Sequence, residues 1–331
     1  MRKSTRILIY RVSAAIILIL LGYALYRSLP INKEHFQEQS KLRFINWIDY
    51  DMPRNNSIRY FSELFSGCID NYDEIRIYSI WPKVTQVEKD DSKQILHVQY
   101  VGEGDKDSNK NSQLSDLNMF DINIVPGDQP QSNVFGIPFL HFYLYSNSID
   151  VSPLSSKRAY LGNKEKFCLF SVSNGVPQER IEFFKELSKY KAVDSCGKVL
   201  NTGYMCPGNY HSDEYRKYIS QYKFMICFEN TSSKNYLTEK LMIAYHSGTI
   251  PIYWGCTNID EYINRDSILY LKPDYTEYDV NALINTIKLL DENDTLYKKK
   301  FEEPLFHEGK VPDTLTMSYL SEAICSRIKS V

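Results

Sequence analysis

The stretch KFMICFENTSSKNYLTEKLMIAYHSGTIPIYWG, residues 223–255, decides the fold. A short apolar run ends at Glu229 and Asn230, and a polar loop, an amphipathic segment stopped by Gly248 and a second apolar run, TIPIYW, follow it. Two apolar runs of strand length around a segment of helical period predict a βαβ unit, and glycine is a common residue just after a helix end. A βαβ unit belongs to a parallel sheet with helices against its faces.

The same alternation of strands and helices extends along the chain. Downstream of residue 165, FCLFSVSN (167–174) predicts a strand, and PQERIEFFKELSKY (177–190) and EYRKYISQY (214–222) predict helices. Upstream, we expect strands at Leu42–Trp47, Glu74–Ile80, Gln94–Val101 and Asn118–Val125, with a helix around Ser57–Phe65. Two α/β blocks with a seam near residues 150–165 indicate two facing Rossmann-like domains.

Composition excludes several classes of protein. The 331 residues are 43% hydrophobic and 24% charged, which is typical of a folded globular protein. The 39 basic and 41 acidic side chains leave a net charge of −2, so nucleic acid is not an expected partner. The seven cysteines include no CxxC pair, which argues against a structural zinc site. If the chain folds in an oxidising compartment, Cys196 and Cys206 are the nearest plausible disulfide pair.

The N-terminus predicts a membrane anchor. Residues 1–11 carry four cations and no acid, and residues 12–29 contain the apolar run VSAAIILILLGYALY. An excess of cations holds the flanking segment in the cytosol, so 1–11 is expected to be a cytosolic tail and 12–29 a transmembrane signal-anchor. Residues 30–40 are expected to form a stem. The alternative is a cleaved signal peptide, because the apolar run is near the length of such a signal.

A phosphate-binding position is expected where the polar loop of the 223–255 stretch meets its helix. Free backbone amides and the positive end of the dipole at a helix start attract phosphate, and Lys240 would add a charge. Glu239 could accept hydrogen bonds from ribose hydroxyls. The stretch contains neither a GxGxxG nor a Walker loop, and a capped helix with a solvated Glu-Lys pair explains the same residues.

Residues 167–271 closely resemble the donor-binding half of the α1,3/α1,4-fucosyltransferases, glycosyltransferase family 10. The elements SN…R…VDS-x-G, FEN, Y-x-TEK and IPIYWG occur in the order found in that family. The resemblance implies the GT-B fold, in which two Rossmann-like domains enclose a cleft. On this basis we expect an acceptor-side domain at 41–160 and a GDP-fucose-binding domain at 161–331.

The resemblance also implies roles for individual residues. Arg180 and Lys240 match the cations that hold the diphosphate of GDP-fucose, and other donor contacts match Asn230, Tyr236 and Glu239. The element HVQYVGEG (97–104) matches the family's proposed catalytic base at Glu103.

The segment after Glu103 departs from the family pattern. Glu103 is followed by Gly104 and Asp105, where the family usually has Asn or Ser-Pro. Asp105 and Asp107 therefore remain alternative bases.

The resemblance implies an inverting transfer of L-fucose from GDP-fucose to a glycan acceptor, with O3 of GlcNAc as the expected position. Glu103 would take the proton of the acceptor hydroxyl, and Arg180 and Lys240 would stabilise the leaving diphosphate. No metal or other cofactor is expected to be required, and a divalent metal would at most stimulate. In a eukaryote the chain would be a type II protein of the Golgi membrane with a lumenal catalytic domain.

Two other functions fit parts of the sequence. DYD (49–51) or DKD (105–107) could be the metal-binding Asp-x-Asp of a GT-A glycosyltransferase. A membrane-anchored sugar-binding protein on a transferase fold would bind GDP without transferring fucose.

Overall fold

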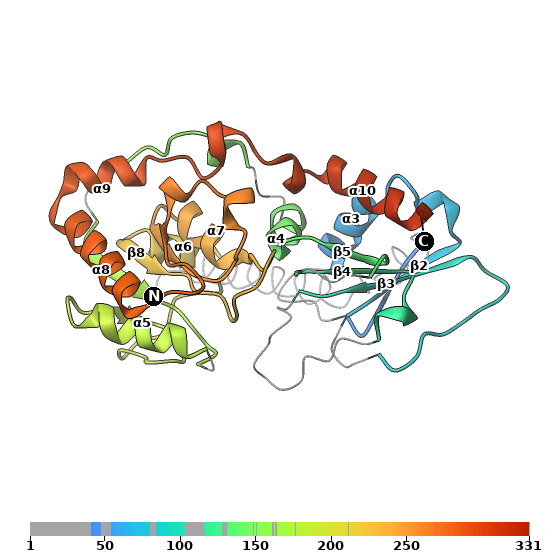
Figure 1. Cartoon of the computed structure of the whole chain (residues 1–331), viewed down its shortest axis with the longest axis horizontal. Helices are drawn as coiled ribbons and strands as arrows, with labels where there is room; N and C mark the ends of the chain where they lie inside the picture. Colours follow the sequence, from blue (N-terminus) through green and yellow to red (C-terminus); the bar gives the residue numbers. More distant parts are fainter. Residues whose placement is uncertain are drawn as a thin grey trace, which may run out of the picture.

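Two α/β units make up the described chain, and each is built on a five-stranded parallel sheet. Figure 1 shows the first unit at right, mainly in blue and green, and the second at left, mainly in yellow and orange. The predicted α/β class with two Rossmann-like sheets is therefore confirmed. The computed structural model describes residues 41–47, 54–79, 84–102, 116–127, 131–147, 149, 151–160, 162, 164–175, 177–210 and 212–330.

The first sheet has its strands in sequence order. They are β1 (Leu42–Ile45), β2 (Glu74–Tyr78), β3 (Ile95–Tyr100), β4 (Ile122–Val125) and β5 (Val134–Gly136). One face packs on α3 (Arg54–Leu64) through an aromatic core that contains Phe61, Phe65 and Tyr100. Loop residues such as Val84 and Phe120 cover the opposite face. All four predicted strands of this half are present, each within a few residues of its expected bounds.

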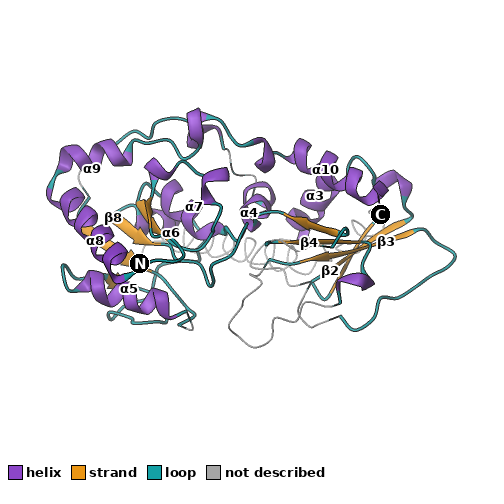
Figure 2. Cartoon of the chain, in the orientation of Figure 1, coloured by secondary structure: helices purple, strands orange, loops and turns teal. Residues whose placement is uncertain are grey.

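The second sheet has the order β10-β9-β8-β6-β7, and helices cover both faces (Figure 2). Leu169 of β6 faces a core shared with α6 and α7, whereas Phe170 faces a core shared with α5, α8 and α9. The elements are β6 (Lys166–Phe170), α5 (Gln178–Ser188), β7 (Asp194–Ser195), α6 (Asp213–Ile219), β8 (Tyr222–Ile226), α7 (Glu239–His246), β9 (Ile250–Tyr253), β10 (Leu269–Tyr270), α8 (Glu277–Glu292) and α9 (Asp294–Phe301). The predicted βαβ unit is β8, α7 and β9.

Short 3-10 helices occupy several of the connections. They are η1 (Ile69–Asn71), η2 (Leu117–Met119), η3 (Ser152–Ser155), η4 (Ile259–Glu261), η5 (Arg265–Ser267), η6 (His307–Gly309) and η7 (Asp313–Leu315). Gly248 adopts a φ of +74° directly after α7 and Ser247, which fits the predicted helix stop because only glycine adopts this region without strain.

Helix α4 (Phe139–Ser146) belongs to both cores and lies between the two sheets in Figure 1. Leu140, Tyr143 and Leu144 pack into the core of the second unit, whereas Phe142 packs into the core of the first. The backbone N–H of Leu140 also donates to Leu237 O at 2.8 Å, in the loop before α7. Because its opposite faces are buried in different units, α4 fixes one unit against the other.

The last helix, α10 (Met317–Ser330), returns to the first unit and packs beside α3 (Figure 1). Its residues Leu320 and Ile324 lie in the first unit's core, and Cys325 forms a disulfide with Cys68, 257 positions earlier. Such a bond typically stabilises a fold by about 2–5 kcal/mol. Cys196 and Cys206, named as the nearest plausible pair for an oxidising compartment, also form a disulfide, whereas Cys68–Cys325 was not anticipated.

Several predicted features lie outside the described residues. They are the tail 1–11, the anchor 12–29, the stem 30–40, the base Glu103, and the Asp-x-Asp segments 49–51 and 105–107. Within the part of the chain that is described, no helix has the length and apolar character needed to cross a membrane. Gly102, directly before Glu103, is described.

Candidate functional site

Two cavities flank the loop that joins β8 to α7. One, of about 270 Å³, lies where β6 and β8 end and α7 begins, and we call it the α7 cavity. The other, of about 490 Å³, is lined by residues of both units, and we call it the junction cavity. Ligands of open α/β sheets bind at the carboxyl ends of strands, which is the position of the α7 cavity.

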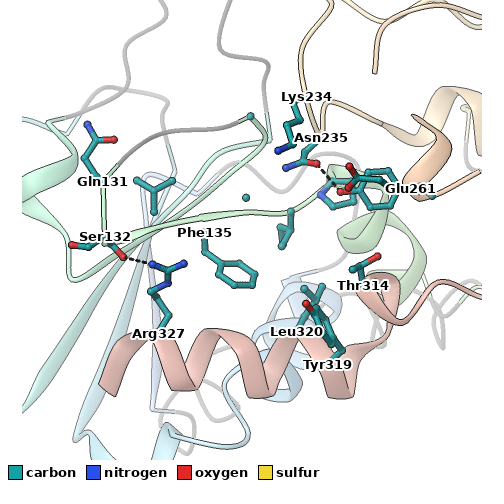
Figure 3. Close-up of a pocket in the computed structure, with 16 residues that line it drawn as sticks. Gln131, Ser132, Phe135, Lys234, Asn235, Glu261, Thr314, Tyr319, Leu320 and Arg327 are labelled. Carbon is teal, nitrogen blue, oxygen red and sulfur yellow. Dashed lines mark hydrogen bonds between the residues drawn. The ribbon is translucent and has the colours of Figure 1, made fainter. Parts of the chain in front are cut away.

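The junction cavity lies between β5, α10 and the loop that carries Lys234 and Asn235 (Figure 3). Its Arg327 is exposed and donates to Ser132 O at 3.2 Å. Tyr262 Oη and Asn258 Nδ2 both donate to Asn235 Oδ1. None of the described residues that line it has a buried polar side-chain atom without a hydrogen-bond partner. Its walls therefore do not indicate a particular ligand.

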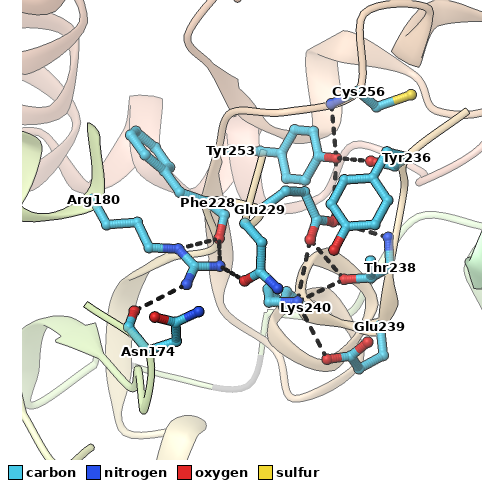
Figure 4. Close-up of polar contacts among 11 residues, drawn as sticks. Asn174, Arg180, Phe228, Glu229, Tyr236, Thr238, Glu239, Lys240, Tyr253 and Cys256 are labelled. Atoms are coloured by element: carbon cyan, nitrogen blue, oxygen red, sulfur yellow. Dashed lines mark hydrogen bonds and ion pairs between the residues drawn. The ribbon is translucent and has the colours of Figure 1, made fainter. Parts of the chain in front are cut away.

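Arg180 of α5 reaches from the end of β6 to the end of β8 across the α7 cavity (Figure 4). Its Nε and Nη2 donate to Phe228 O at 3.0 and 2.7 Å, and Nη2 also donates to Asn230 Oδ1 at 2.7 Å. Nη1 donates to Asn174 O at 3.3 Å. A guanidinium has five N–H groups, so these four bonds leave one N–H of Nη1 for a ligand.

Among the described residues, Arg180 has no close counterion. The side chain is 2% exposed, and no ion pair forms between it and any other described residue. Burial lowers the pKa of the guanidinium, and the more distant Glu229 carboxylate opposes that effect. Arginine stays protonated even so. A buried cation whose hydrogen-bond partners are all neutral is unbalanced, and it favours an anion in the cavity.

Lys240, in the first turn of α7, supplies the second cation. Its Nζ lies 3.2 Å from Glu229 Oε2 and 3.6 Å from Glu239 Oε1, and it donates to Thr238 Oγ1 at 3.0 Å. Burial lowers the pKa of this amine, but the two carboxylates outweigh burial and raise the pKa above its ordinary value. Lys240 is therefore charged and already paired before any ligand binds.

The start of α7 faces the same cavity. Its N-cap residue Thr238 makes no side-chain cap, because the Thr238 hydroxyl donates to Glu229 Oε2 at 2.7 Å. The amides of the first helical turn thus have no side-chain acceptor from the N-cap, and the helix dipole adds positive potential there. Together with Arg180 and Lys240, this makes the α7 cavity suited to a phosphate or diphosphate.

The structure gathers four of the five predicted donor residues in one cavity: Arg180, Asn230, Glu239 and Lys240. The fifth, Tyr236, is 1% exposed and does not line it. Tyr236 follows Asn235, which adopts a φ of +59°, and it accepts a hydrogen bond from Tyr253 Oη at its carbonyl. The Tyr236 side chain is therefore buried under the loop and does not face the cavity.

Sequence reasoning missed two contributors to this cavity. Tyr215 of α6 lines it and donates from its hydroxyl to Ser171 Oγ at 2.7 Å, yet it appeared in the sequence only as one apolar position of a helix. Glu229 is fully buried beneath Lys240, and its place at a strand end did not distinguish it from a solvated acid. The partner, Lys240, is eleven positions further along the chain, so the burial of this acid leaves no local signal in the sequence.

Comparison with known proteins agrees with this geometry. The family model described as glycosyltransferase family 10 (fucosyltransferase) C-term matches residues 161–330. The GDP-fucose protein O-fucosyltransferase 3 of Xenopus laevis is 31% identical over 153 residues, covering 44% of this chain and 31% of that protein. The 4-galactosyl-N-acetylglucosaminide 3-α-L-fucosyltransferase 9 of Bos taurus is 34% identical over 143 residues, covering 42% and 37%. The chain thus spans about a third of these relatives.

A solved structure shows the same fold over most of the chain. The crystal structure of an α1,3-fucosyltransferase with GDP-fucose superimposes with a TM-score of 0.60 at 21% identity, covering 87% of this chain and 90% of that one. Both units take part in the match, so the fold likeness extends beyond the region covered by the family model.

Replacing Lys240 by methionine tests the cavity directly. The change removes one of two cations, and a charge-assisted contact is worth about 1.5–3 kcal/mol, so the Kd for GDP should rise at least about tenfold. Isothermal titration calorimetry measures this, with the exposed Lys299 changed to methionine as the matched control. Equal GDP affinity in folded Lys240→Met and in wild type would remove Lys240 from the site.

Proposed function

Because the chain belongs to glycosyltransferase family 10, the fucosyltransferases, we propose that it transfers L-fucose from GDP-fucose to a hydroxyl of a glycan, with inversion at the anomeric carbon. The observation that carries this proposal is the α7 cavity, where a charged lysine and a buried arginine that has no counterion among the described residues face the start of a helix. This arrangement suits the diphosphate of a sugar nucleotide.

Donor binding would use the cavity as follows. The diphosphate would accept from the remaining N–H of Arg180 Nη1, from the amides at the start of α7 and from Lys240. Glu239, with 20% of its side chain exposed, would turn from Lys240 toward the ribose hydroxyls. As the bond between C1 of fucose and the β-phosphate oxygen breaks, the electron pair stays on GDP, and the two cations stabilise the added charge.

Glu103 is the proposed base. It would take the proton of the acceptor hydroxyl while that oxygen bonds to C1 from the face opposite GDP. The residue before it supports this placement: a Cβ on Gly102 would come 2.9 Å from the ring of Phe139, the first residue of α4. The next residue of α4, Leu140, donates to Leu237 in the loop before α7. The segment after β3 and the loop before α7 therefore both contact the start of α4.

The proposed acceptor is O3 of a GlcNAc-containing glycan. One relative is named for an N-acetylglucosaminide and another for protein O-fucosylation, so the assay must offer both kinds of acceptor. The family model matches residues 161–330, the half expected to bind the donor, and it does not cover the half expected to bind the acceptor.

No metal is assigned to the proposed reaction, because Arg180 and Lys240 already supply the charge that a metal would supply at the diphosphate. Within the described ranges no three His, Cys, Asp or Glu side chains group as metal ligands. The GT-A alternative needs a metal at an Asp-x-Asp segment, so chelation distinguishes the two mechanisms.

Purified full-length chain should consume GDP-fucose and not UDP-sugars, and it should do so in EDTA. The measurement is release of GDP and mass analysis of acceptors, with GlcNAc glycans and a polypeptide offered in parallel. Transfer from a UDP-sugar, or activity that disappears in EDTA and returns with Mn²⁺, would support the GT-A mechanism instead. Binding of GDP-fucose without transfer to any acceptor would indicate a sugar-binding protein, and fucose on the polypeptide alone would overturn the acceptor assignment.

The substitution Glu103→Gln should lower kcat at least about 100-fold and leave the Kd for GDP within about twofold, because the base acts on the acceptor and not on the diphosphate. Asp105→Asn is the matched variant, since it removes a neighbouring carboxylate. If Glu103→Gln keeps its activity and Asp105→Asn loses it, the base is Asp105.

We also propose that the chain is a type II membrane protein anchored by residues 12–29, with both units outside the cytosol and in the Golgi lumen of a eukaryotic host. The two disulfides support this location, because the cytosol keeps thiols reduced. In microsomes, Asn55 and Asn293, which are exposed and in sequons, should be glycosylated. Asn230 should not be, since it is bound to Arg180 in the cavity. Digestion of both units by protease added outside intact microsomes would contradict this topology.

A further inference from the structure

We propose that Glu229 is a positioning residue of the donor site, whose carboxylate holds the Lys240 amine and the start of α7 where they meet the diphosphate. The proposal rests on the proposed function because it concerns the same cavity. Glu229 itself does not line that cavity, so it would act through Lys240 and not on the donor.

Glu229 is fully buried and accepts from three sides (Figure 4). Oε1 accepts from Thr238 N at 2.8 Å and from Tyr253 Oη at 3.3 Å. Oε2 accepts from Thr238 Oγ1 at 2.7 Å and lies 3.2 Å from Lys240 Nζ. One carboxylate thus connects the end of β8, the end of β9 and the start of α7.

The backbone of Gly255 packs directly against the Glu229 side chain. Gly255 adopts a φ of +144°, and a Cβ built on it would lie 2.5 Å from Glu229 Cγ and 2.6 Å from Glu229 Cβ. Real Cβ atoms do not approach other atoms so closely, so position 255 admits only glycine. The N–H of Glu229 donates to Trp254 O at 2.9 Å, which fixes the main chain at the same point.

Of the described contacts of Glu229, the one to Lys240 is the contact that requires a negative charge. Its contacts to Thr238 and Tyr253 come from neutral donors, which an uncharged oxygen could also accept. Lys240 is the one cation within ion-pair distance of Glu229 among the described residues. Because a buried carboxylate is costly without a cation beside it, an acid at this position indicates a requirement for a fixed, charged lysine.

The charge of Lys240 depends on its neighbours. The titratable groups that face Lys240 or its partner carboxylate are Glu229, Glu239, Arg180, Cys227, Tyr253 and Cys256. Burial and Arg180 lower the pKa of Lys240, while Glu229 and Glu239 raise it. Without the Glu229 charge the pKa must fall, so Lys240 would lose its proton, and the donor its cation, at a lower pH.

The test is Glu229→Gln, which keeps the shape and removes the charge. We expect the Kd for GDP to rise about tenfold and the alkaline limb of log(kcat/KM) to move to lower pH by about one unit or more. The acidic limb, set by the proposed base, should stay in place. Glu74→Gln is the control, because Glu74 is a buried acid paired with Arg76 in the first unit, away from the cavity.

A double-mutant cycle tests the proposal even if the Glu229→Gln chain folds poorly. If Glu229 acts through Lys240, then Glu229→Gln should change GDP affinity little in a Lys240→Met background, and the double variant should recover part of any Tm lost by Glu229→Gln alone. Independent, additive effects on both GDP affinity and Tm would overturn the proposal. So would a Glu229→Gln chain that matches wild type in GDP affinity and alkaline limb.

These readouts separate this proposal from the proposed function. Wild-type chain that binds no GDP would refute the donor site itself. Wild-type chain that binds GDP, together with additive effects in the cycle, would refute only the positioning role of Glu229.

Discussion

The Arg180 guanidinium joins the turn after β6 to the turn after β8, and the geometry of the α7 cavity depends on that bond network. It binds a main-chain carbonyl of each turn and the side-chain oxygen of Asn230. A lysine donates all its hydrogen bonds from one nitrogen, whereas the guanidinium spreads its donors over three nitrogens in a fixed planar fork. The same side chain therefore builds the wall of the cavity and supplies its unbalanced positive charge.

The charges at the cavity are equal in number but unequal in distribution. Glu229 and Glu239 both lie beside Lys240, whereas the hydrogen-bond partners of Arg180 within the described part of the chain are all neutral. An incoming diphosphate would thus meet an arginine whose charge is not balanced. It would also meet a lysine that must replace one of its carboxylate contacts by a contact to phosphate. The contact with Glu239 is longer and more exposed than that with Glu229, so Glu239 is the carboxylate free to leave. Glu229 keeps the lysine in place during that exchange.

Local patterns in the sequence predicted much of this structure. The β8–α7–β9 unit, the start of α5 after Pro177 and the stop at Gly248 follow from periodicity and from residues with fixed backbone preferences. The clustering of Arg180 with Lys240 came from the family resemblance, because their spacing along the chain carries no such information. The burial of Glu229 could not be predicted, since it depends on the separate approach of Tyr253 and Gly255.

The remaining features that the sequence did not predict join the two units. They determine the spacing between the end of β3 and the loop before α7. Helix α4 reads in the sequence as one apolar segment, yet its faces divide between two cores. The Cys68–Cys325 disulfide also attaches the last helix, α10, to the first unit. With α4 packed against both cores, the distance from the end of β3 to the loop before α7 is set by the Phe139 and Leu140 contacts. The spacing of the two units at this point therefore depends on the packing of one short helix.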